Sequence, residues 1–292
     1  MSLVSMAPML RHARANLYGV AAYNMIDYNS ARAVIDGATA LDAPVIVQVS
    51  VKTVKHLSYK AVASFVRMLA EDAPVPVALH LDHCTDIEVI KRCIDAGWTS
   101  VMFDGSALPY AENLAKSQQI YALTQSAGVG LEAEIGAIGG VEDDKVVNDD
   151  QSRLANFDEC VAFVQEMPDL AVFAPAIGTA HGFYAGEANI AYDLLKRITD
   201  AISIPIALHG GTGLTNDQFH RCIALGCGKV NISTMHKRLF IEAFVALKAL
   251  KPKLAEPLPF IIAQYDAMKA DVMTCITTFG SVGRASAAAW AA

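Results

Sequence analysis

The sequence predicts a closed barrel of eight parallel strands, each followed by a helix, from two observations. Short runs rich in apolar and β-branched residues recur eight times, and amphipathic stretches with apolar residues at helical spacing separate them. The runs are almost continuously apolar, which indicates strands buried on both faces. Eight such units favour a (β/α)8 TIM barrel over the alternative, an open doubly wound sheet. The runs begin near Val20, Pro44, Val75, Ser100, Gly130, Leu170, Pro205 and Lys229.

The helices expected between these strands have Gly or Asp near many of their ends, as helix boundaries commonly do. They cover residues 30–42, 58–72, 86–97, 110–128, 191–202 and 215–226. The regular spacing fails once, after the fifth strand, where residues 137–158 form a long acidic stretch with glycines. Long loops inside compact domains are commonly functional, so we expect an active-site lid there, with a solvated insertion as the alternative.

Composition sets the class of protein. A chain of 292 residues can form one large core, and we expect a single domain over residues 1–292. The formal charge of -7 argues against nucleic-acid or anionic-membrane partners but not against small phosphorylated ligands. The six cysteines show no C-x-x-C spacing and are expected to be free thiols. No signal-like or membrane-spanning apolar run is apparent, so we expect a cytoplasmic protein.

Polar residues gather where the predicted strands end. The carboxyl ends of barrel strands converge on one mouth, whereas a polar group inside an apolar strand would be costly without a partner. We therefore expect these residues to meet: Asn24, Ser50, Asp82, His83, Asp104, Glu134, His209, Asn231 and Ser233, with His181 three residues past the sixth strand.

Three of these side chains, His83, His181 and His209, could form the all-histidine ligand set of a catalytic zinc site with an open fourth position. A lone buried histidine is more often a hydrogen-bonded core residue, and His80 keeps that interpretation. The remaining histidines are expected to be solvent-exposed in helices or loops; they are His12, His56, His220 and His236.

The carboxylates have distinct candidate roles. Asp82 stands beside His83 and could act as a base, although a surface-turn aspartate is the alternative. Asp104 and Glu134 could fix a histidine tautomer, and Glu134 could be an extra metal ligand. Asp104 could equally cap the turn of the sequence DGS.

Two loops near the end of the barrel could bind phosphate. HGGTGLTNDQF, residues 209–219, is a glycine-rich loop entering a helix with Thr215 as the expected N-cap, and NIST, residues 231–234, follows the eighth strand. Exposed backbone amides and helix N-termini favour anions, and the loops after strands 7 and 8 are a frequent phosphate position in this fold. A glycine after a strand is otherwise usually only a turn.

The motifs taken together resemble class II fructose-bisphosphate and tagatose-bisphosphate aldolases from about Asn24 to Arg284. They are YNMID, LHLDHC, SVMFDGS, EAEIGAIGGVEDD, PAIGTAHGFY, HGGTGL, KVNIST and FGSVGRA. The resemblance implies a zinc enzyme with one ion per chain, held by His83, His181 and His209. Asp82 matches the base that removes the C4 hydroxyl proton. Glu142 resembles the acid that moves the dihydroxyacetone-phosphate proton, and Glu134 the carboxylate near the metal.

The same resemblance implies fructose 1,6-bisphosphate as substrate, cleaved to dihydroxyacetone phosphate and glyceraldehyde 3-phosphate. Asn231 would lie near the carbonyl-bearing carbons, and Asn24 and Ser50 would line the pocket. A homodimer or homotetramer and an additional monovalent cation are also implied. The phosphate of dihydroxyacetone phosphate would meet Gly182, Gly210, Gly211, Thr212, Ser233 and Thr234.

Departures from the family pattern concern the substrate. Fructose-bisphosphate enzymes usually read NxDT and tagatose-bisphosphate enzymes NxAT after strand 8, whereas this chain reads NIST followed by Met235. YNMIDYNS also lacks the His or Asn usual shortly after its first asparagine. A tagatose-bisphosphate or other ketose-phosphate aldolase is therefore the alternative.

Three other mechanisms or roles fit the sequence less well. A Schiff-base aldolase needs a lysine projecting into the barrel. None is expected, because Lys229 opens the eighth strand at the wrong end and Lys52 lies beyond the second. A zinc hydrolase has no evident use for the phosphate loops, and the complete set of three histidines and one aspartate disfavours a non-catalytic companion subunit of an aldolase complex.

Overall fold

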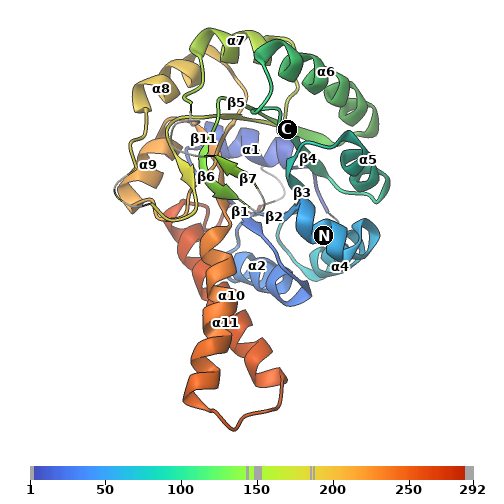
Figure 1. Ribbon diagram of the computed structural model, residues 1–292, viewed down its shortest axis with the longest axis vertical. Coiled ribbons are helices and arrows are strands. Elements are labelled where there is room, and N and C mark those ends of the chain that lie inside the picture. The colour runs from blue at the N-terminus through green and yellow to red at the C-terminus, as the bar shows by residue number, and fades with distance from the viewer. Residues whose placement is uncertain (1–2, 143–144, 148–152, 185, 187, 287–292) are drawn as a thin grey trace.

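The barrel closes in the order β1-β11-β10-β8-β5-β4-β3-β2, with every neighbouring pair parallel. A computed structural model describes the chain apart from residues 1–2, 143–144, 148–152, 185, 187 and 287–292 (Figure 1). The barrel strands are β1 (Val20–Asn24), β2 (Val45–Ser50), β3 (Val77–Cys84), β4 (Ser100–Phe103), β5 (Gly130–Ile135), β8 (Val172–Pro175), β10 (Ile206–Leu208) and β11 (Cys227–Ile232). Each predicted run overlaps one of them, so the TIM-barrel prediction is confirmed and the open sheet is excluded.

The six predicted helices are also present, with boundaries shifted by a few residues. They are α2 (Tyr28–Ala40), α4 (Tyr59–Asp72), α5 (Ile87–Asp95), α6 (Tyr110–Ala127), α8 (Tyr192–Ala201) and α9 (Asn216–Ala224). Thr215 caps α9 as expected, in a reciprocal capping box with Gln218. Two short helices add to the outer layer, α3 (Val51–Leu57) and α7 (Phe157–Gln165).

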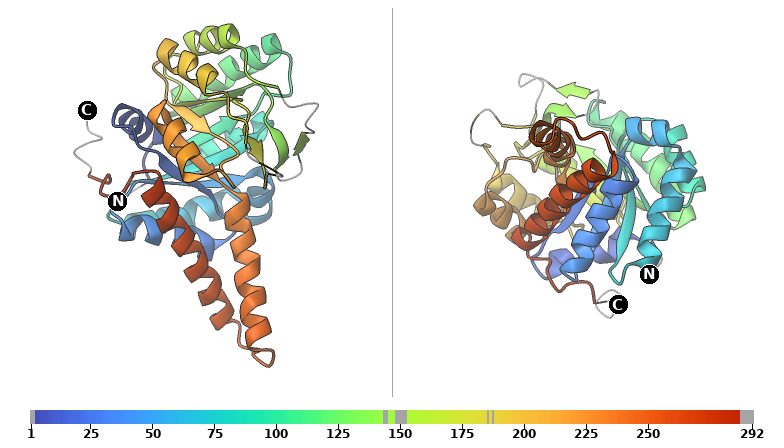
Figure 2. Two further views of the ribbon diagram at one scale, coloured as in Figure 1. Left: turned by 90° about the vertical axis from the view of Figure 1, so that its left-hand side faces the viewer. Right: turned by 90° about the horizontal axis from the view of Figure 1, so that it is seen from below.

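Helix α1 (Met6–Ala15) closes the end of the barrel away from the candidate site. Its buried face joins apolar side chains of β1, β2, β3 and β8 in a small core separate from the larger one between barrel and helices. Figure 2 (left) shows α1 at one end of the barrel and the β6–β7 hairpin at the other. The α1 end of the barrel is therefore filled by apolar side chains, and the polar candidate residues lie at the opposite end.

The long stretch after β5 contains a hairpin of β6 (Gly139–Glu142) and β7 (Lys145–Val147). β6 also pairs in parallel with β9 (Ala180–His181), opposing Gly140 to His181. A Cβ at Gly140 would clash with the His181 backbone, so glycine permits this close pairing. The predicted lid segment therefore begins beside a candidate metal ligand.

The last two helices, α10 (Thr234–Leu250) and α11 (Leu258–Thr278), form an antiparallel arm that extends far from the barrel (Figures 1 and 2). The base of α11 packs on α2, where a Cβ on Gly37 would meet Val272. The arm exposes large apolar side chains, which are Ile241, Phe244, Val245, Leu250, Leu258, Ile261 and Ile262. Among the described residues, no helix combines the length and apolar character needed to cross a membrane.

Candidate active site

An irregularity in β3 brings the neighbours Asp82 and His83 into one cluster. Adjacent residues of a regular strand face opposite sides, but the register of β3 against β4 shifts between Leu81 and Cys84. His83 has a φ of 42°, in the left-handed region that non-glycine residues seldom occupy. Such a conformation costs roughly 1–3 kcal/mol and is concentrated at functional sites.

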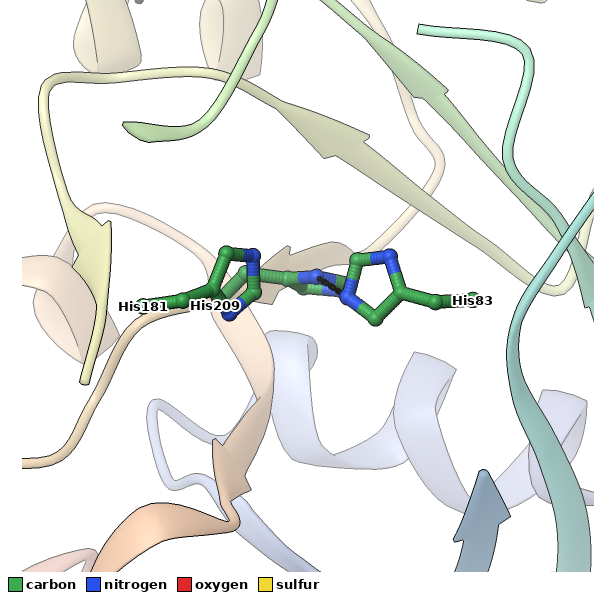
Figure 3. A group of neighbouring side chains, drawn as sticks. All are labelled: His83, His181 and His209. Carbon is green, nitrogen blue, oxygen red and sulfur yellow. Dashed lines mark hydrogen bonds between the residues drawn. The ribbon is translucent and has the colours of Figure 1, made fainter. Parts of the chain in front are cut away.

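His83, His181 and His209 meet at the mouth of the barrel, as predicted (Figure 3). A ring nitrogen from each lies within 4.8 Å of the others. The ring centroids of His83 and His209 are 4.6 Å apart, and that of His181 lies 5.0 Å from His83. His209 is buried, whereas His83 and His181 are partly exposed, so the cluster opens toward solvent on one side.

Two carboxylates fix the tautomers of His83 and His209. Nδ1 of His83 lies 3.1 Å from Oδ2 of Asp104, and Nε2 of His209 lies 2.6 Å from Oε1 of Glu132. Because carboxylate oxygens only accept, these two nitrogens carry the ring protons. Burial lowers the pKa of His209 to about 4, so its imidazole is neutral at pH 7.

The two remaining ring nitrogens point at each other. Nε2 of His83 and Nδ1 of His209 are 2.9 Å apart, and with the tautomers above each presents a lone pair. Facing lone pairs at this distance repel unless a proton or a metal ion lies between them, and a proton here would require one of the two rings to be a charged imidazolium. The three histidines therefore fit a bound divalent metal ion, with neutral imidazole ligands typical of zinc.

The predicted carboxylates fit this arrangement. Asp104 serves both proposed roles, because its Oδ1 accepts from the backbone and hydroxyl of Ser106 while Oδ2 accepts from His83. Oε2 of Glu134 lies 3.7 Å from Nδ1 of His209, within reach of an ion at that nitrogen. Glu142 belongs to β6, but its side chain lies outside the described part of the structure.

Asp82 is buried beside three side-chain amides. Oδ2 accepts from Nδ2 of Asn24 at 2.8 Å and from Nε2 of Gln48 at 3.4 Å. Oδ1 lies 3.5 Å from Nδ2 of Asn231. An ionised carboxylate only accepts hydrogen bonds, so these donors match the charged form that a base requires. The surface-turn interpretation of Asp82, which is 1% exposed, is wrong.

A buried ion pair lies beneath the histidines, and here the interpretation of Lys229 is wrong. β11 begins at Cys227, so Lys229 lies inside the strand, fully buried in the barrel. Its Nζ is 2.9 Å from Oε2 of Glu132 and donates to Oδ1 of Asn231 at 2.7 Å. Burial alone would raise the pKa of Glu132, but the Lys229 ammonium and the bonds from His209 and His80 hold it well below its usual range. An ammonium paired in this way is no Schiff-base nucleophile.

The six residues predicted to meet phosphate line one small pocket at the mouth, together with His181 and Asn231; the six are Gly182, Gly210, Gly211, Thr212, Ser233 and Thr234. Gly210 has a φ of 65°, and a Cβ there would clash with the Ala180 backbone. The hydroxyl of Tyr184 donates to the Gly210 carbonyl at 2.7 Å and accepts from the Ala180 amide at 2.9 Å. This tyrosine ties the loop of His181 to the glycine-rich loop. Ser50 lies at the end of β2, as predicted, in register with Asp82 and as the N-cap of α3, and it is not among the residues that line this small pocket.

Two other histidine predictions have opposite outcomes. His80 is a buried core residue as expected, with Nδ1 3.0 Å from the Ser100 hydroxyl and Nε2 3.2 Å from Glu132. His236 was expected to be exposed, but it is fully buried against Tyr23 at the start of the arm. Neither ring nitrogen of His236 has a hydrogen-bond partner among the described residues.

The sequence interpretation missed Glu132, Gln48 and the role of Lys229. Side chains of a strand share a face at every second residue. Each missed residue lies two positions before a predicted one on the same strand, as Glu132 does before Glu134. Charged residues within apolar barrel strands require partners. That spacing was the signal that could have identified a second polar layer under the mouth.

Comparison with known proteins agrees with this geometry. The family model described as "Fructose-bisphosphate aldolase class-II" matches residues 4–284. A fructose-bisphosphate aldolase from Geobacillus stearothermophilus is 38% identical over 289 residues, covering 98% of this chain and 100% of that protein. A 6-phospho-5-dehydro-2-deoxy-D-gluconate aldolase from Halalkalibacterium halodurans is 39% identical over 237 residues, covering 80% and 81%. The crystal structure of the YdjI aldolase from Escherichia coli K12 superposes with a TM-score of 0.85 at 27% identity, covering 97% and 99%.

Proposed function

The chain belongs to the class II fructose-bisphosphate aldolase family, and from that premise we propose that it cleaves a ketose 1,6-bisphosphate with one zinc ion per chain. We favour fructose 1,6-bisphosphate as substrate, with dihydroxyacetone phosphate and glyceraldehyde 3-phosphate as products. One observation carries the proposal. Three facing histidines, the Asp82 carboxylate and a glycine-lined pocket are built around the same barrel mouth.

The histidine cluster supports the metal part of the proposal. His83, His181 and His209 would hold the ion, and Glu134 lies close enough to assist. When bound, the cation supplies Lewis-acid polarisation of the substrate carbonyl and stabilises negative charge that develops beside it. Three neutral imidazoles with an open position suit zinc. The monovalent cation implied by the family resemblance stays a prediction.

Asp82 is the proposed base. In cleavage its carboxylate takes the proton of the C4 hydroxyl, after which the C3–C4 bond breaks, the aldehyde leaves and the electron pair stays on the dihydroxyacetone-phosphate half. The amides of Asn24 and Gln48 hold one carboxylate oxygen, and the other faces Asn231. The base is thus oriented before the substrate binds, which lowers the entropic cost of the proton transfer.

The pocket lined by Gly182, Gly210, Gly211, Thr212, Ser233 and Thr234 is the proposed phosphate site. Its residues offer backbone amides and hydroxyls, and it includes the N-terminus of the 17-residue helix α10. Both features favour an anion. Phosphate bound here would place the adjoining carbons of the substrate next to Asn231 and the histidines.

We also propose that Glu142 returns a proton to the dihydroxyacetone-phosphate half. The pairing of β6 with the His181 strand supports a position near the reacting atoms. A hairpin beside the mouth could close over bound substrate and exclude water during this step.

The substrate is tested by a coupled assay of the purified protein with fructose 1,6-bisphosphate, tagatose 1,6-bisphosphate and 6-phospho-5-dehydro-2-deoxy-D-gluconate. The last compound is included because a relative carries that activity in its name. We expect dihydroxyacetone phosphate to be produced fastest from fructose 1,6-bisphosphate. Faster cleavage of another compound would reassign the substrate, and no cleavage of any would favour a companion subunit.

We further propose a homodimer or homotetramer in the cytoplasm. Seven large apolar side chains are exposed on the arm, and exposed apolar surface of this extent is typical of protein interfaces. All six cysteines are free thiols, which suits a reducing compartment. The formal net charge of -7 argues against nucleic acid as a partner, and the proposed ligands are small sugar phosphates.

A further inference from the structure

Lys229 is a buried charge that has no role in the proposed mechanism. It is fully buried inside the barrel, and burying a lysine is costly unless it is paired. Its ammonium contacts a carboxylate oxygen of Glu132 at 2.9 Å and the side-chain oxygen of Asn231 at 2.7 Å. The first contact balances the charge. The second reaches a residue that lines the phosphate pocket.

The contact with Asn231 determines which way its amide faces. An ammonium has three N–H donors and no acceptor, so only the oxygen of the amide can face it favourably. With Oδ1 on Lys229, Nδ2 points toward Oδ1 of Asp82, 3.5 Å away. The flipped amide would set N–H groups against the ammonium and an oxygen against the Asp82 carboxylate. Lys229 therefore selects one of two orientations that are nearly identical in shape.

We propose that Lys229 is a positioning residue of the aldolase reaction, holding the Asn231 amide as a hydrogen-bond donor toward Asp82 and the bound sugar phosphate. This inference rests on the proposed function. Lys229 touches no substrate itself and acts through Asn231. Glu132 balances its charge while accepting from His209, so one ion pair orders both the base side and the histidine side of the mouth.

Removing Lys229 alone would leave Glu132 buried without its counter-charge, which could unfold the protein. The test therefore replaces both partners of the ion pair, in a Glu132→Gln/Lys229→Met variant in which the new amide oxygen can still accept from His209. We compare this paired variant, Asn231→Ala and the combination of the two with the unchanged chain. Cleavage kcat, affinity for dihydroxyacetone phosphate by calorimetry, metal content and the urea midpoint of unfolding are measured for each.

We expect the paired variant to lower kcat by about tenfold to a hundredfold, the range that a misplaced catalytic-site group commonly costs. Once Asn231→Ala is present, adding the paired substitution should change kcat per bound metal ion and the affinity for dihydroxyacetone phosphate less than about twofold, because coupled residues are not additive. Independent, multiplying losses would overturn the inference. So would a lower urea midpoint with unchanged kcat.

Asn231→Asp in the otherwise natural chain gives a second test that does not depend on removing the lysine. The new carboxylate can still accept from Lys229, but it presents an oxygen where Asn231 presents its N–H. We expect a loss of about a hundredfold in kcat from a folded protein. A kcat within twofold of the unchanged chain would overturn the inference. An inactive unchanged chain would refute the proposed function, and the coupling in dihydroxyacetone-phosphate affinity would then decide the role of Lys229 by itself.

Discussion

Lowering the pH from 7 to 5 should destabilise the protein through His236. This side chain is fully buried, both ring nitrogens are unpartnered among the described residues, and burial lowers its pKa from 6.5 to about 3. In the unfolded chain the imidazole takes up a proton below pH 6.5, whereas in the folded chain it stays neutral down to about pH 3. Stability from this group is therefore present above the unfolded pKa and is lost as the pH falls toward the folded pKa.

The size of the effect follows from the two pKa values. A pH of 5 lies about 1.5 units below the pKa of His236 in the unfolded chain. Each unit by which the pH falls below that pKa lowers the free energy of unfolding by about 1.4 kcal/mol. We thus expect His236 to reduce the free energy of unfolding by about 2 kcal/mol between pH 7 and pH 5. Other groups, including His209, titrate in the same range, so the natural chain alone does not isolate this contribution.

A His236→Phe variant provides the matched control. Phenylalanine keeps a ring beside Tyr23, whose centroid lies 4.9 Å from that of His236, and it removes the titratable nitrogens. Urea unfolding of the metal-free proteins at pH 7 and pH 5 measures the free energy of unfolding of each. The natural chain should lose about 2 kcal/mol more than the variant. Equal losses would refute the reasoning, because His236 would then be able to accept a proton in the folded state.

Three further predictions concern the mouth of the barrel. The Asp82→Asn variant should keep its metal content and its ligand affinity within a few-fold, yet its cleavage rate should fall by ~10² or more in kinetics on protein whose metal content has been measured. Near-normal cleavage would exclude Asp82 as the base. His209→Ala should lose metal in elemental analysis, whereas His80→Ala should mainly lower the unfolding midpoint; equal metal loss in both would place His80 in the ligand set. Glu142→Ala should slow isotope exchange at dihydroxyacetone phosphate by ~10² to 10⁴ more than it weakens binding, and unchanged exchange would assign the proton transfer to another group.

The sequence was sufficient to predict the barrel because the signals were local and repeated. Near-continuous apolar runs separated by amphipathic helices define the eight barrel units without long-range information. The arm of α10 and α11 was not predicted, because its apolar residues are distributed around both helices and do not mark one buried face. Its separation from the barrel depends on how α11 packs against α2, which is a tertiary contact.

One part of the candidate site could likewise be predicted from the sequence, and another part could not. The gathering of His83, His181 and His209 could be predicted, since strand ends of one barrel must converge. The buried polar residues beneath the histidines could not be placed in this way. The sequence interpretation started the eighth strand at Lys229, whereas β11 starts at Cys227, and this shift turns Lys229 from a residue at the barrel rim into an interior one. The left-handed conformation of His83 also depends on a register shift that spacing alone does not show.

Metal dependence is the central claim, and activity before and after exhaustive chelation tests it most directly. The purified protein should hold about one transition-metal ion per chain. Chelation should abolish the release of dihydroxyacetone phosphate from fructose 1,6-bisphosphate, and added zinc should restore it. Full cleavage activity in protein with no detectable metal would contradict the role assigned to the three histidines.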